Sequence, residues 1–413
     1  LTVKATLQQY DWYTYLPHAF LHPSALQIQG IVLALLSLTW IAARFGMKKV
    51  VGEEGHPLAS VWRLLDTKYA IDRLIPWVLL GAFVMFAFYG AGLGVVQEFA
   101  LRGTTLPNLD VAGFPHQEVF SIGSWILLGL LILIMLANAW ERRRSLYLIG
   151  SLVSISVAIP LLAGRFEAEL ATATAWRFLA ALFFLAGSVC IWNRETIQRQ
   201  LKSFGWPAVE VKVEILATLL RVVLLTLTCA PILFFTFYPA LRALMYAPVQ
   251  VPLGVFALFD STVSYALPLI VIALVFVGYA IREGLPRFNS YAALLLNTTV
   301  SLAYVLSVVS ANGSLDAAVL IRTVQLNAVT LGVHALLWTV LRRRWLQALE
   351  SREREVESLL FLEMSVVAVL TLSVIVPTVF MLIFQIVLGT ATLTAGDSFG
   401  WFTLIVTALT VVV

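Results

Sequence analysis

Charged residues are scarce in this sequence. Asp, Glu, Lys and Arg make up 12% of its 413 residues, whereas hydrophobic residues make up 60%. So small a polar fraction cannot cover the surface of a soluble globular protein of this length. The composition therefore excludes a soluble fold and predicts an integral membrane protein.

The common motifs of nucleotide, metal and redox chemistry are absent. The chain has no GxxxxGK[ST], HExxH or CxxC sequence and no GxGxxG at a strand-to-helix turn. Its two cysteines, Cys190 and Cys229, lie in apolar segments, where they are most simply small core residues. His18 and His22 have the spacing of a helical metal pair, but two imidazoles without further ligands make a poor zinc site. We therefore expect no metal, no cofactor and no enzymatic activity.

Acidic residues are nearly absent from the apolar segments, with Glu363 close to a segment boundary. No segment carries the paired acidic residues of a proton or cation relay, which weakens the case for a coupled transporter. His334 is the single histidine within a predicted span. We expect it to be packed or in contact with water, since a haem held between helices normally needs a pair.

Long apolar segments are what the chain does contain. Most of them reach the ~20 residues that a helix needs to cross ~30 Å of hydrocarbon. They predict an all-α, polytopic membrane protein with helices arranged as hairpins. The eleven predicted spans are residues 25–43, 74–95, 119–139, 146–163, 174–192, 215–238, 265–281, 289–310, 317–340, 361–389 and 400–413.

Most of the 27 basic residues lie in every second loop. The positive-inside rule makes these loops cytoplasmic and places the N-terminus outside. Basic loops beside anionic headgroups also account for the net charge of +4 without nucleic-acid binding. These residues are Arg44, Lys48, Lys49, Arg63, Lys68, Arg73, Arg142–Arg144, Arg194, Arg199, Lys202, Lys212, Arg282, Arg287, Arg342–Arg344, Arg352 and Arg354.

Two charged, helix-compatible connectors, 193–214 and 341–360, interrupt the series of spans. We expect such connectors to lie along the membrane surface or to extend a helix beyond it. The first residue is Leu1, and the last residues, TALTVVV, stop within an apolar run, so we expect an internal piece of a longer chain. The predicted parts are an external segment, 1–24; spans one to five, 25–192; a connector and spans six to nine, 193–340; and a connector and spans ten and eleven, 341–413.

A weak internal repeat relates segments separated by roughly 150 residues. FAFYGAGL (Phe86–Leu93) resembles FTFYPALRAL (Phe235–Leu244), and a similar offset pairs Arg177 with Arg322. The repeating unit has four helices. Because four is an even number, successive copies share one orientation, unlike the inverted repeats of many transporters. The alternative is chance alignment of apolar helices.

Three arginines fall within predicted spans: Arg177, Arg221 and Arg322. Arginine at the bilayer centre costs ~2.5–3.5 kcal/mol on insertion scales. Arg177 and Arg322 lie about one turn inside the outer boundary, and Arg221 about two turns from the cytoplasmic one, so each side chain can snorkel to headgroups. They are candidates for lipid contact or for structural intramembrane charges, with a transport site as the alternative.

Four segments resemble the membrane region of the large MscS-type mechanosensitive channels, of the MscK and MscM kind. The shared order of these segments over about half of the chain is more specific than any one of them. They are LKSFGWPAVEVKVEILATLLRVVLL (Leu201–Leu225), LIVIALVFVGYAIRE (Leu269–Glu283), LGVHALLWTVLRRRWLQALESRERE (Leu331–Glu355) and GDSFGWFTLIVTALTVVV (Gly396–Val413).

The resemblance implies a peripheral, tension-sensing paddle that precedes a Gly- and Ala-rich pore helix. It also implies a heptamer in the bacterial inner membrane, with a periplasmic N-terminus. The partners would be membrane lipids and the ions that pass a downstream pore. Two alternatives stay open: a transporter with a site between helices, and a non-conducting membrane scaffold.

Overall fold

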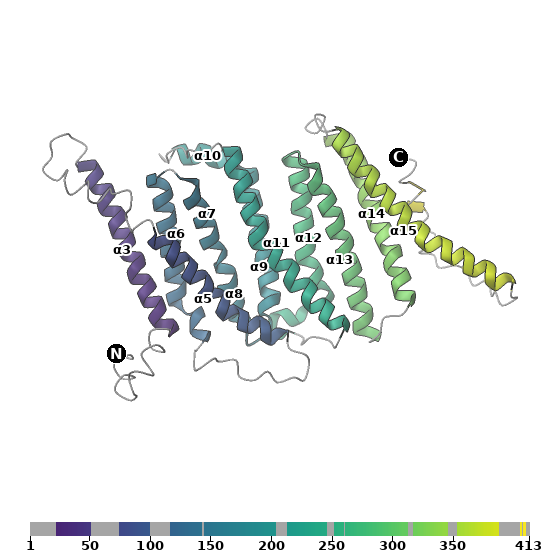
Figure 1. Ribbon diagram of the computed structural model, residues 1–413, viewed down its shortest axis with the longest axis horizontal. Coiled ribbons are helices and arrows are strands. Elements are labelled where there is room, and N and C mark those ends of the chain that lie inside the picture. The colour runs from purple at the N-terminus through teal and green to yellow at the C-terminus, as the bar shows by residue number, and fades with distance from the viewer. Residues whose placement is uncertain are drawn as a thin grey trace. The chain divides into compact units, whose positions relative to one another are not determined.

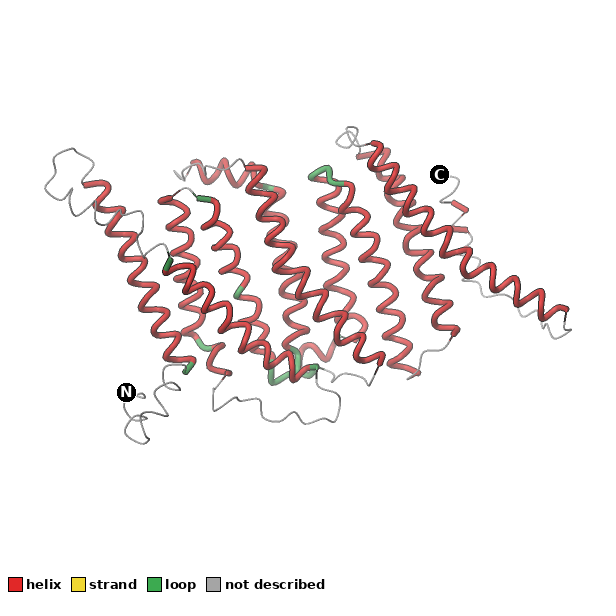
Figure 2. Tube along the Cα trace, viewed as in Figure 1, coloured by secondary structure: helices red, strands yellow, loops and turns green. Residues whose placement is uncertain are grey.

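The computed structural model describes residues 22–50, 74–99, 116–142, 144–203, 213–245, 252–259, 261–312, 317–345, 353–387, 405–406 and 408–409. Every regular element within these ranges is a helix, which confirms the all-α prediction (Figure 2). The α-helices are α3 (Pro23–Val50), α5 (Ile75–Glu98), α6 (Ile122–Arg142), α7 (Ser145–Ser156), α8 (Ala158–Ala163), α9 (Thr172–Trp192), α10 (Arg194–Ser203), α11 (Val213–Met245), α12 (Ser261–Arg282), α13 (Pro286–Asn312), α14 (Ala317–Trp345) and α15 (Glu353–Val387). Short 3₁₀ turns are η3 (His116–Phe120), η4 (Gly164–Phe166) and η5 (Gly254–Leu258).

Ten helical segments of the described residues are long and apolar enough to cross a membrane. They match the first ten predicted spans, so the chain is a multi-pass integral membrane protein. The eleventh prediction, 400–413, falls almost wholly outside the described residues. The fourth span, Ser145–Phe166, is interrupted at Val157. Pro160 accounts for the break, because it has no N–H to donate to the carbonyl of Ser156.

The chain divides into two compact units. Unit 1 comprises residues 1–231 and 249–256, and unit 2 comprises residues 232–248 and 257–413. The division falls within α11 rather than in the predicted connector 193–214. That connector contains α10, as its helix-compatible sequence predicts.

In unit 1, α3 and α6 run parallel (Figure 1). Near the start of both helices, Gln27 Nε2 donates to Ser124 Oγ at 3.0 Å. Near their ends, Arg44 Nη2 lies 2.5 Å from Glu141 Oε2. Parallel packing agrees with the alternating basic loops, since the first and third spans must cross the membrane in the same direction.

Helix α5 presents a face of small residues to its neighbours. Ala87, Gly90, Ala91 and Gly94 are buried on one side of the helix. A Cβ at Gly94 would overlap with Oγ1 of Thr172, the first residue of α9. Small residues let helix backbones approach closely in a membrane, so this face fixes the end of α5 against the start of α9.

In unit 2, the main contacts are between helices adjacent in sequence: α12 with α13, α13 with α14, and α14 with α15 (Figure 1). Short connections make these pairs antiparallel hairpins. Two apolar clusters join them. Ala280, Trp338, Val356 and Leu360 form the first, and Ala293, Leu331 and Val367 the second.

The close approach at Gly94 predicts that a larger residue there lowers the stability of the protein. Gly94→Ala should lower the free energy of unfolding by about 1–3 kcal/mol, because the new methyl group overpacks the contact with Thr172. Gly92→Ala is the matched control on the same helix, since a Cβ there meets nothing within 4 Å. Alanine also favours a helix over glycine by about 1 kcal/mol, so the control should be neutral or stabilising. Thermal unfolding midpoints in one detergent compare the two, and equal midpoints would contradict the packing.

Candidate functional site

Arg177, the first of the three candidate arginines, is enclosed by protein. Its side chain lies one turn inside α9 and is 1% exposed. Its Nη2 donates a 2.9 Å hydrogen bond to Thr174 Oγ1, and that hydroxyl donates a 2.7 Å bond to Glu98 Oε1. The expected snorkelling of Arg177 to headgroups is therefore not what the structure shows. The guanidinium is part of a buried polar network instead.

Glu98 anchors this network and caps α9 from another helix. Its carboxylate accepts the backbone N–H of Ala173 at 2.5 Å and that of Thr174 at 3.2 Å. The first N–H groups of a helix have no partner within the helix, and a negative charge there is favourable. Glu98 lies beyond the predicted second span, 74–95, which implied a place in the loop after it. That placement is wrong, because Glu98 is the last residue of α5 and is 4% exposed.

The other two candidate arginines lie on different helices. Arg221 is half-buried on α11 in unit 1. Arg322 is half-buried on α14 in unit 2, where Nη1 lies 3.4 Å from Gln325 Oε1. Arg177 and Arg322, which the predicted repeat pairs, each occupy the sixth position of their helix. Lipid contact, structural charge and transport remain predictions for both half-buried arginines.

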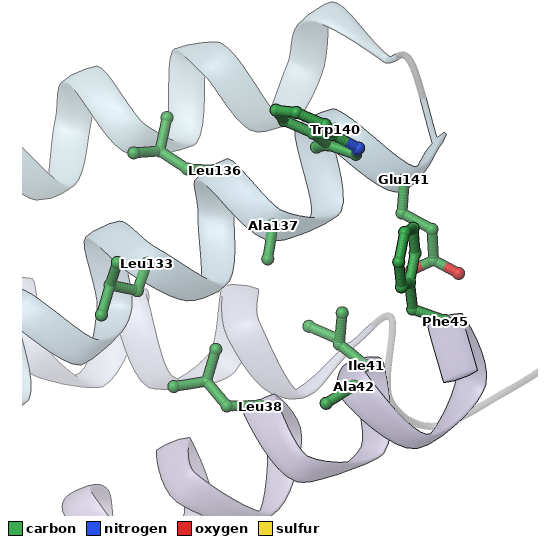
Figure 3. Close-up of a pocket in the computed structure, with 9 residues that line it drawn as sticks. All are labelled: Leu38, Ile41, Ala42, Phe45, Leu133, Leu136, Ala137, Trp140 and Glu141. Atoms are coloured by element: carbon green, nitrogen blue, oxygen red, sulfur yellow. The ribbon is translucent and has the colours of Figure 1, made fainter. Parts of the chain in front are cut away.

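An apolar groove of about 410 Å³ lies between α3 and α6, along the line where the two helices pack (Figure 3). Glu141 and Phe45 lie together at one end, and Leu38 and Leu133 lie toward the other. Glu141 also forms the ion pair with Arg44, which is 2% exposed. The groove is therefore apolar along most of its length and charged at one end. A lipid molecule has the same arrangement, with an apolar chain and a polar headgroup. Its lining residues are Leu38, Ile41, Ala42, Phe45, Leu133, Leu136, Ala137, Trp140 and Glu141.

A histidine and a carboxylate pair inside unit 2. His334 Nδ1 on α14 lies 2.7 Å from Glu363 Oε1 on α15, and each residue is 9% exposed. Glu363 was predicted close to a boundary, and His334 was expected to be packed or in contact with water. The structure buries both and joins them in one hydrogen bond. Within a membrane, an ionisable pair of this kind is a functional-site candidate by default.

A line of polar side chains runs along the same face of α14. Thr323, Asn327, Thr330 and His334 are spaced three or four residues apart, which places them on one side of a helix. Asn327 Oδ1 accepts a 2.7 Å hydrogen bond from Ser301 Oγ on α13. From this face of α14, Asn327 contacts Ser301 of α13 and His334 contacts Glu363 of α15.

These contacts were missed from sequence because each joins residues far apart in the chain. Glu98 and Thr174 are separated by 76 residues, and His334 and Glu363 by 29. The sequence did contain one indication that His334 and Glu363 form a pair. Both residues are ionisable and lie toward the facing ends of adjacent predicted spans, 317–340 and 361–389, which an antiparallel hairpin brings side by side.

A metal site would need several His, Cys, Asp or Glu ligands close together in the described part of the chain. No group of three or more His, Cys, Asp or Glu residues could hold an ion there. His22 Nδ1 lies 3.6 Å from Glu118 Oε2, and His18 is outside the described residues.

Removing the Glu98 carboxylate should strongly destabilise unit 1. Glu98→Ala leaves a buried arginine without its counter-charge and two helix N–H groups without an acceptor, so we expect a loss of about 3–5 kcal/mol. Glu195→Ala, on exposed α10, should change stability by less than about 0.5 kcal/mol. Thermal unfolding of both variants in the same detergent measures the difference. A Glu98→Ala protein as stable as the Glu195→Ala control would contradict the network.

No protein-family model, curated protein or solved structure matches this chain. The resemblance to the large MscS-type channels therefore rests on the four segments quoted above and stays a prediction.

Proposed function

We propose that this chain is the tension-sensing membrane region of a mechanosensitive channel subunit, which biases a pore elsewhere in the full-length protein during osmotic downshock. The observation that carries the proposal is the large apolar surface that the helices leave uncovered. In each candidate span, half of the residues or more are not buried within the chain. Large apolar side chains that are more than 60% exposed include Met85, Ile122, Leu294, Phe361 and Val369.

Such a surface is in contact with lipid, so a change in the bilayer acts on it directly. A stimulus shifts a two-state equilibrium only by interacting differently with the two states. Helices packed mainly against their sequence neighbours, as in unit 2, can change their in-plane area or lipid contacts without breaking a large protein core. Membrane tension favours the state with the larger area. The groove between α3 and α6 offers a further lipid contact, since its walls are apolar and one end carries Glu141.

On this proposal the protein lies in a bacterial inner membrane with its N-terminus in the periplasm. Subunits form a homo-oligomer, a heptamer by the family resemblance, and the chain is not an enzyme. Its partners are membrane lipids and the ions that pass the downstream pore.

A transporter is the second candidate, and the His334–Glu363 pair is the observation that favours it. Buried ionisable pairs mark proton and ion pathways in transporters. A transport site between helices predicts water access to residues near Arg221 or Arg322. Cysteines placed beside these arginines should react with membrane-impermeant thiol reagents if a transporter is right, and stay unreactive if the tension sensor is right.

Channel activity is tested with the full-length protein in spheroplasts. Pressure steps applied to membrane patches should evoke currents that a strain lacking the gene does not show. Equal responses in the two strains, with the protein detected in the membrane, would rule out the proposed function.

Lipid occupancy of the groove is tested separately with phospholipids brominated along the acyl chain. Trp140 lines the groove, so these lipids should quench the part of the tryptophan fluorescence that Trp140→Phe removes. Ala137→Phe fills the groove and should reduce that quenching. Gly129→Phe, at an open position of the same helix, is the control and should leave it unchanged. Equal quenching in both variants would show that lipid does not enter the groove.

A further inference from the structure

The His334–Glu363 pair lies well inside the membrane-spanning part of unit 2. His334 is six residues from the end of the span Val319–Val340, and Glu363 is seven residues from the start of Val356–Ser373. At 1.5 Å per helical residue, both lie about 10 Å from that edge of the apolar region. Neither side chain can reach headgroups from this depth while it keeps the 2.7 Å contact.

Apolar layers enclose the pair on both sides. One turn toward the span edge lie Trp338 and Leu360, which belong to the first apolar cluster of unit 2. One turn deeper lie Leu331 and Val367, which pack with Ala293 of α13 in the second cluster. The pair is therefore held in a dehydrated layer, where a net charge is costly.

The short contact requires a proton between the two side chains. With neutral imidazole donating from Nδ1 to the carboxylate, the pair carries one negative charge. Uptake of one further proton gives either imidazolium with carboxylate or imidazole with carboxylic acid, and both forms are neutral overall. We propose that His334 and Glu363 form an intramembrane proton-binding site, which takes up one proton to become neutral and releases it to become an anion.

Other ionisable groups on the helices around the pair lie toward the helix ends. At the end of the hairpin nearest the pair lie Arg282 of α12, Arg287 and Tyr291 of α13, Arg342–Arg344 of α14, and Glu353, Arg354, Glu355 and Glu357 of α15. Tyr279 of α12 is buried and packs its ring against Phe288. Toward the opposite end lie Tyr265, Tyr304 and Arg322. On α14 and α15, the charged residues nearest along the chain are Arg342, eight residues from His334, and Glu357, six residues from Glu363.

Polar side chains of α14 lie on the same face of the helix as His334. Thr330, Asn327 and Thr323 follow His334 at successive turns toward the start of the helix. Ser301 of α13 bonds to Asn327 in the same line. The hydroxyls of Thr323 and Thr330 donate to backbone carbonyls of α14, so their oxygens offer acceptor positions on this face.

Difference infrared spectroscopy of the purified full-length protein in lipid bilayers tests the proposal. Spectra recorded over a series of pH values should show a protonated-carboxyl or carboxylate signal that changes with pH and is missing from Glu363→Gln. Glutamine keeps the size of the side chain and an acceptor for His334. His334→Asn should move the midpoint of that titration, because asparagine donates a hydrogen bond but takes up no proton. Glu357→Gln, an exposed position on the same helix, should leave the band unchanged.

Two outcomes would overturn the proposal: identical pH-dependent bands in wild type and Glu363→Gln, or an unchanged midpoint in His334→Asn. Should Glu363→Gln fail to accumulate, Glu363→Asp replaces it, and an unshifted carboxyl frequency would then exclude the site. The test does not depend on channel activity, so the proton site and the proposed function can fail separately.

Discussion

Helices in a bilayer gain little from burying apolar surface against one another, because the lipid is as apolar as their side chains. Each helix must satisfy its own backbone hydrogen bonds, so secondary structure forms without tertiary help. Association then depends on close approach of small residues and on a few polar contacts. This constraint explains why Gly94 meets Thr172 so closely, and why buried polar residues gather at helix–helix contacts in both units.

Polar contacts also specify which helices pair and in which direction. Gln27 with Ser124 and Arg44 with Glu141 fix α3 parallel to α6 at both ends. Glu98 joins the end of α5 to the start of α9 by accepting N–H groups that α9 itself cannot satisfy. Any other pairing would leave one of these charges buried without a partner, at a cost of several kcal/mol. The apolar surface alone carries no such preference.

The same constraint determines how much of the molecule could be predicted from its sequence. Spans could be predicted because hydropathy and length are local properties, and Pro160 would have indicated the break in the fourth. The pairs could not, since Glu98 meets its partners on α9 only after 76 residues of intervening chain. A lone glutamate following an apolar run is usually in a loop. Arg177 stood out from the sequence as a charge within a span, but its buried partners, Thr174 and Glu98, are brought together only by the packing of α5 against α9.

When lipid-facing helices are held together by few polar contacts, each contact contributes a large share of the energy that holds the helices together. In a soluble protein, a large core would dominate the difference between two conformations. Here, fewer protein contacts oppose a rearrangement, so lipid packing around α14 and α15 and the protonation of His334 and Glu363 contribute to which conformation is favoured. The pair sits between two small apolar clusters that join α12 to α15 and α13 to α15. A change in its charge therefore acts on the packing of α15 against the rest of unit 2, whichever function that packing serves.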